Sequence, residues 1–235
     1  MLITPPLIPA TLIKRYKRFL GDVILPSGEP LTVHTPNTGA MTGCAEAGAQ
    51  VWLRDTQSSR RQYRYSWEVS QSREGTLVGV HTGLVNRLVS EAIANHTIKE
   101  LQGYAQLRQE VKYGDENSRI DLLLQHPGRT DCYVEIKNVT ARDDTGTAFF
   151  PDAVSTRGTR HLRELMGMAR RGYRAVIFFC VQRDDIQALR PADEVDAQYA
   201  ATLRQALDSG VEALAYKARV SPGEIRLYEK VPVRV

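Results

Sequence analysis

The spacing of apolar residues changes near position 82, and this change limits the folds open to the chain. Before it, short apolar segments are separated by turn clusters such as Pro26-Ser27-Gly28 and Pro36-Asn37-Thr38-Gly39. Short, regularly spaced strands joined by polar turns are typical of a small barrel or sandwich. The first part of the chain, residues 1–81, is therefore predicted to be a small β-barrel with strands at 11–20, 22–25, 31–34, 50–53, 65–71 and 76–81.

From position 82 onward, helical and strand patterns follow one another. Apolar residues recur at helical spacing over 83–95, and three short strand patterns come next, with turns predicted at 114–117 and 126–128. Two more helices are expected, each followed by a strand, which is the order of a mixed α/β sheet. Residues 82–235 are thus predicted to form an α/β domain with helices 83–95, 156–172 and 197–208 and strands 110–113, 119–125, 132–140, 175–182 and 211–220.

One acidic residue interrupts the apolar strand 119–125, and an acidic–lysine pair lies on the next strand. Glu135 and Lys137 are two positions apart and share a strand face, while Ile136 points into the core. A hairpin would bring Asp121 beside Glu135. Two carboxylates and a backbone carbonyl suit Mg²⁺ or Mn²⁺, and a nearby lysine suits phosphodiester hydrolysis. The alternative is a simple ion pair between Glu135 and Lys137 on an exposed strand.

Composition and charge exclude several classes of protein. The formal net charge is +4 and the pI about 9.0, so nucleic acid is a suitable partner where the basic residues cluster. Three widely spaced cysteines without a CxxC pair argue against a disulfide framework or a zinc site. The chain shows no signal peptide, no membrane-length apolar run and no phosphate-binding loop, so a cytoplasmic protein is expected.

Basic residues cluster in three places that suit DNA. Six arginines fall on one arc of the helix that begins at Thr156, opposite its apolar arc, namely Arg157, Arg160, Arg163, Arg170, Arg171 and Arg174. Basic and aromatic residues interleave in two segments of the barrel, Lys14, Arg15, Lys17 and Arg18, and Arg60, Arg61, Tyr63 and Arg64. Aromatics that face the barrel core, between solvated arginines, are the equal alternative. Arg119 shares the strand face of Asp121, whereas His161 is expected on the surface of its helix.

The element order with Asp121…Glu135-Ile136-Lys137 resembles the PD-(D/E)xK nuclease superfamily. Over nearly its whole length the chain also resembles the bacterial sugar fermentation stimulation protein A family, through segments such as 14–19, 34–41, 110–114, 118–121, 150–154, 161–165 and 174–179. The resemblance implies an OB-like barrel, a nuclease-like domain, DNA binding and regulation of sugar, notably maltose, metabolism. It also implies that Glu91 is an auxiliary acid of the site. Ile120 stands where the superfamily motif has proline.

Two functions compete on these residues. In the first, a DNA-binding protein holds Mg²⁺ or Mn²⁺ with Asp121, Glu135 and the carbonyl of Ile136, and Lys137 positions the attacking water. In the second, a non-catalytic regulator uses the same groove only to hold DNA. A purely structural module would leave the convergence of the acidic and lysine residues unexplained. The sequence leaves open the turnover of the site, the form of DNA and the oligomeric state.

Overall fold

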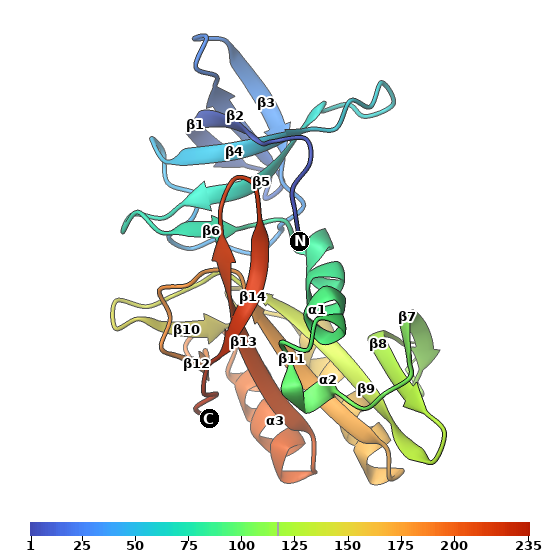
Figure 1. The fold of residues 1–235 in the computed structure, drawn as a ribbon. Helices are drawn as coiled ribbons and strands as arrows, with labels where there is room; N and C mark the ends of the chain where they lie inside the picture. The colour runs from blue at the N-terminus through green and yellow to red at the C-terminus, as the bar shows by residue number, and fades with distance from the viewer. Residues whose placement is uncertain (117) are drawn as a thin grey trace.

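The computed structural model describes residues 1–116 and 118–235 and shows a barrel stacked on an α/β domain (Figure 1). Five strands form the barrel in the order β3-β2-β1-β4-β5, and a parallel contact between His34 and Ser66 joins β3 to β5. Buried residues such as Leu12, Val33 and Trp67 fill it. The predicted small barrel is therefore confirmed, with strands β1 (Ile8–Tyr16), β2 (Leu20–Ile24), β3 (Pro30–His34), β4 (Gln50–Asp55), β5 (Tyr65–Gln71) and the short β6 (Leu77–Gly79).

The first predicted strand, 11–20, is wrong in its extent. The chain turns at Lys17 and Arg18, whose φ angles of 49° and 66° are left-handed, and β2 already begins at Leu20. Neither residue at the turn is a glycine, proline, asparagine or aspartate, the residues that usually mark a turn. The composition of the segment therefore could not reveal the hairpin between β1 and β2.

A six-stranded mixed sheet forms the centre of the α/β domain, in the order β14-β13-β11-β9-β8-β7. Strands β9, β11 and β13 are parallel, and the strands at both edges are antiparallel. The strands are β7 (Gln106–Tyr113), β8 (Ser118–His126), β9 (Arg129–Val139), β11 (Arg174–Val181), β13 (Glu212–Val220) and β14 (Ile225–Lys230). Strand β14 and the parallel pair β10 (Thr147–Phe150) and β12 (Ala188–Pro191) were not predicted. Of the turn predicted at 114–117, residue 117 lies outside the described residues.

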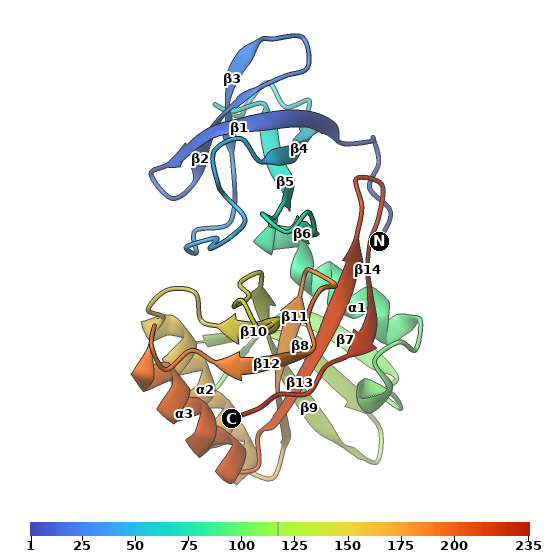
Figure 2. The ribbon, with the colours of Figure 1, turned by 90° about the vertical axis from the view of Figure 1, so that its left-hand side faces the viewer.

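Helices cover both faces of this sheet, as Figures 1 and 2 show. Helix α1 (Val85–Ala94) packs on one face, and α2 (Thr156–Arg170) and α3 (Ala197–Asp208) pack on the other. Strand β11 is buried on both faces: Val176 and Phe178 contact the α1 side, whereas Ile177 and Phe179 contact the α2 and α3 side. Burial on two faces explains its continuous apolar sequence. None of the described helices is long and apolar enough to span a membrane.

Side-chain caps fix where the two C-terminal helices begin. Ser155 Oγ accepts a hydrogen bond of 3.0 Å from the backbone N–H of Gly158, and Asp196 caps α3 at Tyr199 in the same way, at 2.9 Å. Gly210, with a φ of 90°, ends the turn after α3, because few other residues adopt this conformation. The start of α2 is important for the site, since it sets which α2 residues face β9.

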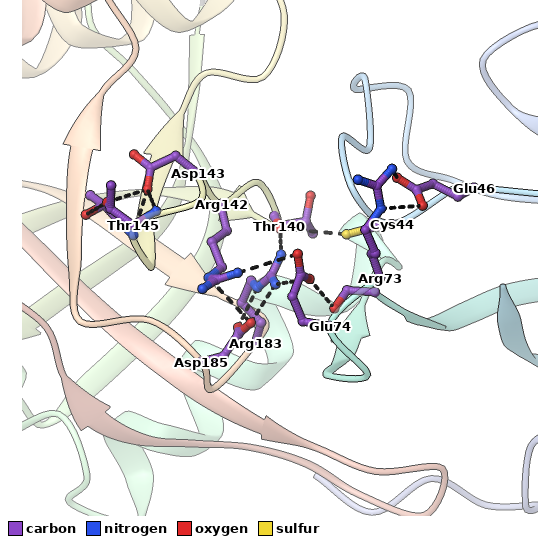
Figure 3. A network of polar contacts seen from close by, with 12 residues as sticks. Cys44, Glu46, Arg73, Glu74, Thr140, Arg142, Asp143, Thr145, Arg183 and Asp185 are labelled. Carbon is purple, nitrogen blue, oxygen red and sulfur yellow. Dashed lines mark hydrogen bonds and ion pairs between the residues drawn. The ribbon is translucent and has the colours of Figure 1, made fainter.

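The barrel and the α/β domain contact each other through buried polar groups (Figure 3). The Arg183 guanidinium is 2% exposed and donates to the carbonyl of Thr140 at 2.9 Å and to both oxygens of Asp185 at 2.7 Å. It also lies 3.8 Å from Glu74 of the barrel. Cys44, on the connection between β3 and β4, donates to the same Thr140 carbonyl. Asp185 of the same domain pairs with the buried guanidinium and Glu74 adds a charge from the barrel, so the burial of Arg183 is compensated.

The first residues of the chain pack on the α/β domain rather than in the barrel. Met1, Ile3 and Leu7 are buried in the apolar cluster that contains α1. The backbone N–H of Ile3 donates to the carbonyl of Gly223 at 2.8 Å, which attaches this segment to the hairpin of β13 and β14. The chain therefore enters the barrel only at β1, and this segment joins the two parts.

Candidate metal centre

The ladder between β8 and β9 is interrupted at Asp121, and the side chain of this residue replaces the missing bond. Leu122 pairs with Val134, but no pairing continues to Asp121. Instead, the Asp121 Oδ2 atom accepts a hydrogen bond of 2.7 Å from the backbone N–H of Ile136. In the pairing between β7 and β8, Glu110 has a left-handed φ of 55° and the ladder omits Glu110 and Asp121, while the register on either side of them is unchanged. Two carboxylates therefore lie at one local interruption of the sheet.

Glu135 and Lys137 lie on the same face of β9, as the alternation of the strand predicts. The Lys137 Nζ atom is 2.7 Å from Glu135 Oε1, and the Glu135 side chain is 3% exposed. Asn86 of α1 holds the acidic pair of the neighbouring strands, donating to Asp121 Oδ1 at 3.1 Å and to Glu110 Oε1 at 3.3 Å. The structure thus brings Asp121, Glu135 and Lys137 together at the centre of the sheet.

The pKa values of the two buried carboxyl groups of the site are shifted in opposite directions. Burial, together with the charge of Glu135, raises the pKa of Asp121 to about 6. Burial also disfavours the charge of Glu135, but Lys137 and His161 outweigh it and lower the pKa of that carboxyl. Near neutral pH both groups carry charge and repel each other. A bound cation would relieve this repulsion.

A divalent cation would satisfy the free carboxylate oxygen of this site. Glu135 Oε1 contacts Lys137 and His161, whereas Glu135 Oε2 is buried and has no hydrogen-bond partner among the described residues. A buried anionic oxygen without a partner is costly unless a cation or water satisfies it. Within residues 1–116 and 118–235, no three His, Cys, Asp or Glu side chains are grouped as a ready ligand set. Two carboxylates with backbone and water oxygens match the way proteins hold Mg²⁺.

His161 is a part of the site that the sequence did not reveal. Expected on the helix surface, it is instead 5% exposed, because this side of α2 packs against β9. Its Nδ1 atom contacts Glu135 Oε1 and lies 3.3 Å from Lys137 Nζ. Arg157, one turn earlier, donates to its Nε2 atom at 3.3 Å, so the ring proton lies on Nδ1, toward Glu135. The sequence signal that could have placed His161 in the site is its spacing of four residues from Arg157 and from the buried Leu165, because residues four apart share a helix face.

The site lies at the bottom of a cleft of about 510 Å³, which we call the metal cleft. Residues of the α/β domain form its floor, and residues 36–39 of the barrel form the opposite wall. Figure 2 shows the connection between β3 and β4 descending from the barrel toward β10. Its Met41 N–H donates to Asp152 Oδ2 at 3.1 Å. The cleft is therefore built by both parts of the chain.

The structure does not bring Glu91 to the metal cleft. The Glu91 carboxylate pairs with the amino group of Met1, and its side chain is 40% exposed. Glu91, which we expected as an auxiliary acid of the site, therefore lies away from the cleft. The acidic residue that does line the cleft beside Asp121 is Glu110, at the interruption of the ladder between β7 and β8.

Several of the predicted DNA-contacting residues have other partners in the fold. Arg15 donates to the carbonyls of Asn37 at 3.0 Å and Gly39 at 2.8 Å, so it supports the wall of the metal cleft. Arg18 donates to Thr38, and Arg64 forms a two-bond ion pair with Asp55. The predicted arc of six arginines is corrected, because α2 ends at Arg170 and Arg174 lies on β11. Acidic residues pair with three of the six, namely Arg163 with Glu116, Arg171 with Asp115 and Arg174 with Glu212. The arc is thus less basic than its sequence indicates.

The remaining basic residues stay at the surface. Lys14 is 65% exposed with Asp22 at 3.5 Å, and Lys17 and Arg119 are exposed. Arg157 of α2 lines the metal cleft, and Arg160 on the same helix is half-buried. Arg60 is exposed as well, whereas Arg61 and Tyr63 line a second hollow, on the barrel. The positive charge nearest the metal centre therefore comes from Lys137 and Arg157.

This arrangement defines a class of protein in which an OB-type barrel is joined to an α/β domain with an acidic–lysine centre. The family model for the SfsA N-terminal OB domain matches residues 13–80, and the one for the sugar fermentation stimulation protein RE domain matches residues 83–224. The chain belongs to the sugar fermentation stimulation protein family. The resemblance to this family is confirmed, and so is the predicted fold class of a small OB-type β-barrel followed by a mixed α/β domain.

Relatives and a solved structure match over almost the whole chain. A sugar fermentation stimulation protein homolog of Pelobacter propionicus is 56% identical, covering 97% of this chain and 98% of its own. That of Thioalkalivibrio sulfidiphilus is 53% identical, with coverage of 95% and 93%. A solved structure of Pyrococcus furiosus SfsA in complex with Ca²⁺ is 27% identical, with a TM-score of 0.89 and coverage of 100% and 98%. The fold is therefore shared along its full length.

Proposed function

We propose that this protein binds DNA and carries a metal-dependent, nuclease-like site in the metal cleft. The observation that carries the proposal is the group of Asp121, Glu135 and Lys137, in which Glu135 Oε2 is buried and lacks a partner among the described residues. The Ca²⁺ complex of the Pyrococcus furiosus relative supports a divalent cation. In this proposal residues 1–81 bind nucleic acid and residues 82–235 carry the nuclease-like site.

Asp121, Glu135 and the carbonyl of Ile136 would hold Mg²⁺ or Mn²⁺, since these ions prefer oxygen ligands. When bound, the ion would supply positive charge for the phosphate and would lower the pKa of the attacking water, so that this water loses its proton more easily near neutral pH. The protein itself prepares this site. Asn86 and the Ile136 N–H orient the Asp121 carboxylate before any ligand arrives. Orientation by neighbouring hydrogen bonds is what keeps such ligands in a productive geometry.

Lys137 is placed to act on the phosphate and the attacking water. Its ammonium donates to Glu135 Oε1 at 2.7 Å, which fixes its position at the floor of the cleft. A fixed cation in a site with little water stabilises the charge that develops on a phosphate. Arg157, on the wall of the cleft, adds a second cation for the nucleic-acid backbone.

A non-catalytic DNA-binding regulator is the second candidate. Lys137 and His161 both contact Glu135 Oε1, which leaves one oxygen of this carboxylate free for a cation. A cation held at this oxygen, without any catalysed reaction, would be enough for a groove that only holds DNA. In either form, we propose a cytoplasmic protein that binds DNA without sequence preference and acts in the regulation of sugar, notably maltose, use. Its three free, buried cysteines suit a reducing compartment.

The test is cleavage of labelled single-stranded, nicked and duplex DNA with Mg²⁺, Mn²⁺ or chelator. We expect metal-dependent cleavage that falls about 100-fold or more in Asp121→Ala and Lys137→Ala. Asp144→Ala, at an exposed position, is the charge-matched control and should cleave normally. Metal-independent binding without cleavage on every substrate would leave the regulator. Absence of DNA binding by the unaltered protein would contradict both candidates.

A further inference from the structure

A second hollow, of about 370 Å³, lies on the barrel beside the metal cleft, and we call it the barrel hollow. Pro36 lines both cavities, and His81 of the barrel hollow is followed directly by Thr82 of the metal cleft. The two cavities are therefore neighbours along one surface. Each has the size of a pocket for a small ligand or a part of a larger one.

The side chains of the barrel hollow suit one nucleotide of a DNA strand. Tyr63 lines it with an aromatic ring, and the exposed Arg61 supplies a cation. His34 and His81 line the same hollow as Arg61. Burial, and then the charge of Arg61, lower the pKa of His34, and burial lowers the pKa of His81 against the charge of Glu68. The buried Nδ1 atom of His81 has no hydrogen-bond partner among the described residues. An aromatic face beside a cation and polar ring nitrogens can bind a base and its phosphate.

The boundary between the two cavities is held in place. Thr82 Oγ1 donates to the carbonyl of Pro36 at 3.1 Å, which joins the end of the barrel to the cleft wall. Farther along the wall, a Cβ added to Gly39 would lie 2.5 Å from Asp152 Oδ2, so only glycine fits this close approach. With the bonds from Arg15, these contacts fix residues 36–40 over the metal cleft.

From this geometry we infer that a single DNA strand runs from the barrel hollow across Pro36 to the metal centre. The inference rests on the proposed function and names its substrate class, DNA with an unpaired segment. Tyr63 stacks on an unpaired base, Arg61 contacts the backbone, and the next part of the strand enters the metal cleft. Lys137 and Arg157 then contact the phosphate that lies there.

Two features favour a single strand over a duplex. Stacking on Tyr63 requires a base face that pairing and stacking within a duplex would bury. The fixed wall of residues 36–39 stands opposite the floor of the metal cleft, and the cleft volume of about 510 Å³ suits a nucleotide rather than two paired strands. A duplex could present only an end or an overhang to this path.

Binding measurements with fluorescent DNA test the path. Anisotropy titrations would compare a ten-nucleotide single strand, a blunt ten-base-pair duplex and the same duplex with an overhang, in Mg²⁺ and in chelator. We expect tighter binding to the single strand and the overhang. Tyr63→Ala should weaken that binding about 5- to 150-fold, the range for loss of one stacked base, and leave duplex binding unchanged.

Arg61→Ala should lower the slope of log affinity against log salt by about 0.7 on single strands, as expected for one lost phosphate contact. Arg73→Ala is the matched control, because Arg73 is an exposed arginine of the barrel that lines neither cavity. Equal losses in Arg73→Ala and Arg61→Ala, or blunt duplex bound as tightly as single strand, would overturn the path while DNA binding itself stands. No binding of any DNA by the unaltered protein would instead refute the proposed function.

Discussion

Asp121→Asn is expected to stabilise the metal-free protein at alkaline pH while removing its response to Mg²⁺. Burial and the charge of Glu135 raise the pKa of Asp121 from 3.8 to about 6. Because the folded pKa lies above the unfolded one, Asp121 favours folding in its protonated form. That contribution is complete below pH 3.8 and is lost as the pH rises through 6. The asparagine keeps the shape of the side chain without the charge.

The magnitude follows from the size of the shift. A rise of about two pKa units corresponds to about 3 kcal/mol between the protonated and charged forms at pH 8, and to about 0.5 kcal/mol at pH 4. The asparagine Oδ1 can still accept from Ile136, but the bond with Asn86 must rearrange, at about 1 kcal/mol. We therefore expect a gain of roughly 2 kcal/mol at pH 8 and none at pH 4.

Urea denaturation in chelator at several pH values measures this difference, with Asp144→Asn as a control for removal of one surface charge. Added Mg²⁺ should stabilise the unaltered protein by mass action and leave Asp121→Asn unchanged. A variant that is destabilised equally at pH 4 and pH 8 would refute the repulsion between Asp121 and Glu135. Equal stabilisation of both proteins by Mg²⁺ would refute Asp121 as a ligand.

Three further perturbations address the wall, the contact between the two parts and the support of the ligands. Gly39→Ala should lower the free energy of unfolding by roughly 1–3 kcal/mol, because the added Cβ would meet Asp152. Gly167→Ala, in a helix with open space around it, should raise the free energy of unfolding by about 0.5–1 kcal/mol. Thermal unfolding measures the sign of both changes. Arg183→Met should cost about 3–5 kcal/mol in urea denaturation, because Asp185 is left without its buried partner, and a loss below about 1 kcal/mol would contradict this. Asn86→Ala should weaken Mg²⁺ binding about 10- to 100-fold in calorimetry and Glu91→Ala should not, so equal losses would contradict the placement of the two residues.

The sequence could predict the parts of the site that depend on strand periodicity. Glu135 and Lys137 share a face because side chains alternate along a strand, and the hairpin before them places Asp121 beside Glu135. The interruption of the ladder at Glu110 could not be predicted, because it depends on a left-handed backbone that no glycine indicates. Its position is set by how β7 and β8 pair around the site.

Positions on helices were harder to predict, because periodicity fixes a face but not what packs against it. Glu91 lies on α1 as predicted, yet its carboxylate faces the amino group of Met1, a partner 90 positions earlier in the chain. His161 lies at the edge of the apolar arc of α2, and the packing of that helix on β9 decides that it is buried. Which acid pairs with which arginine depends in the same way on tertiary contacts.

The metal cleft needs both parts of the chain, and the residues that join them explain why some basic residues are not available to DNA. Arg15 is one of the residues that its sequence context assigns to phosphate, but its guanidinium is used to hold the carbonyls of residues 37, 39 and 40. Met41 and Gly39 then fit against Asp152 of the other domain. A barrel that only bound DNA would not need this attachment. Fixing this loop over Asp121 and Glu135 costs conformational freedom. That cost has a function if the loop directs a DNA strand toward the two carboxylates.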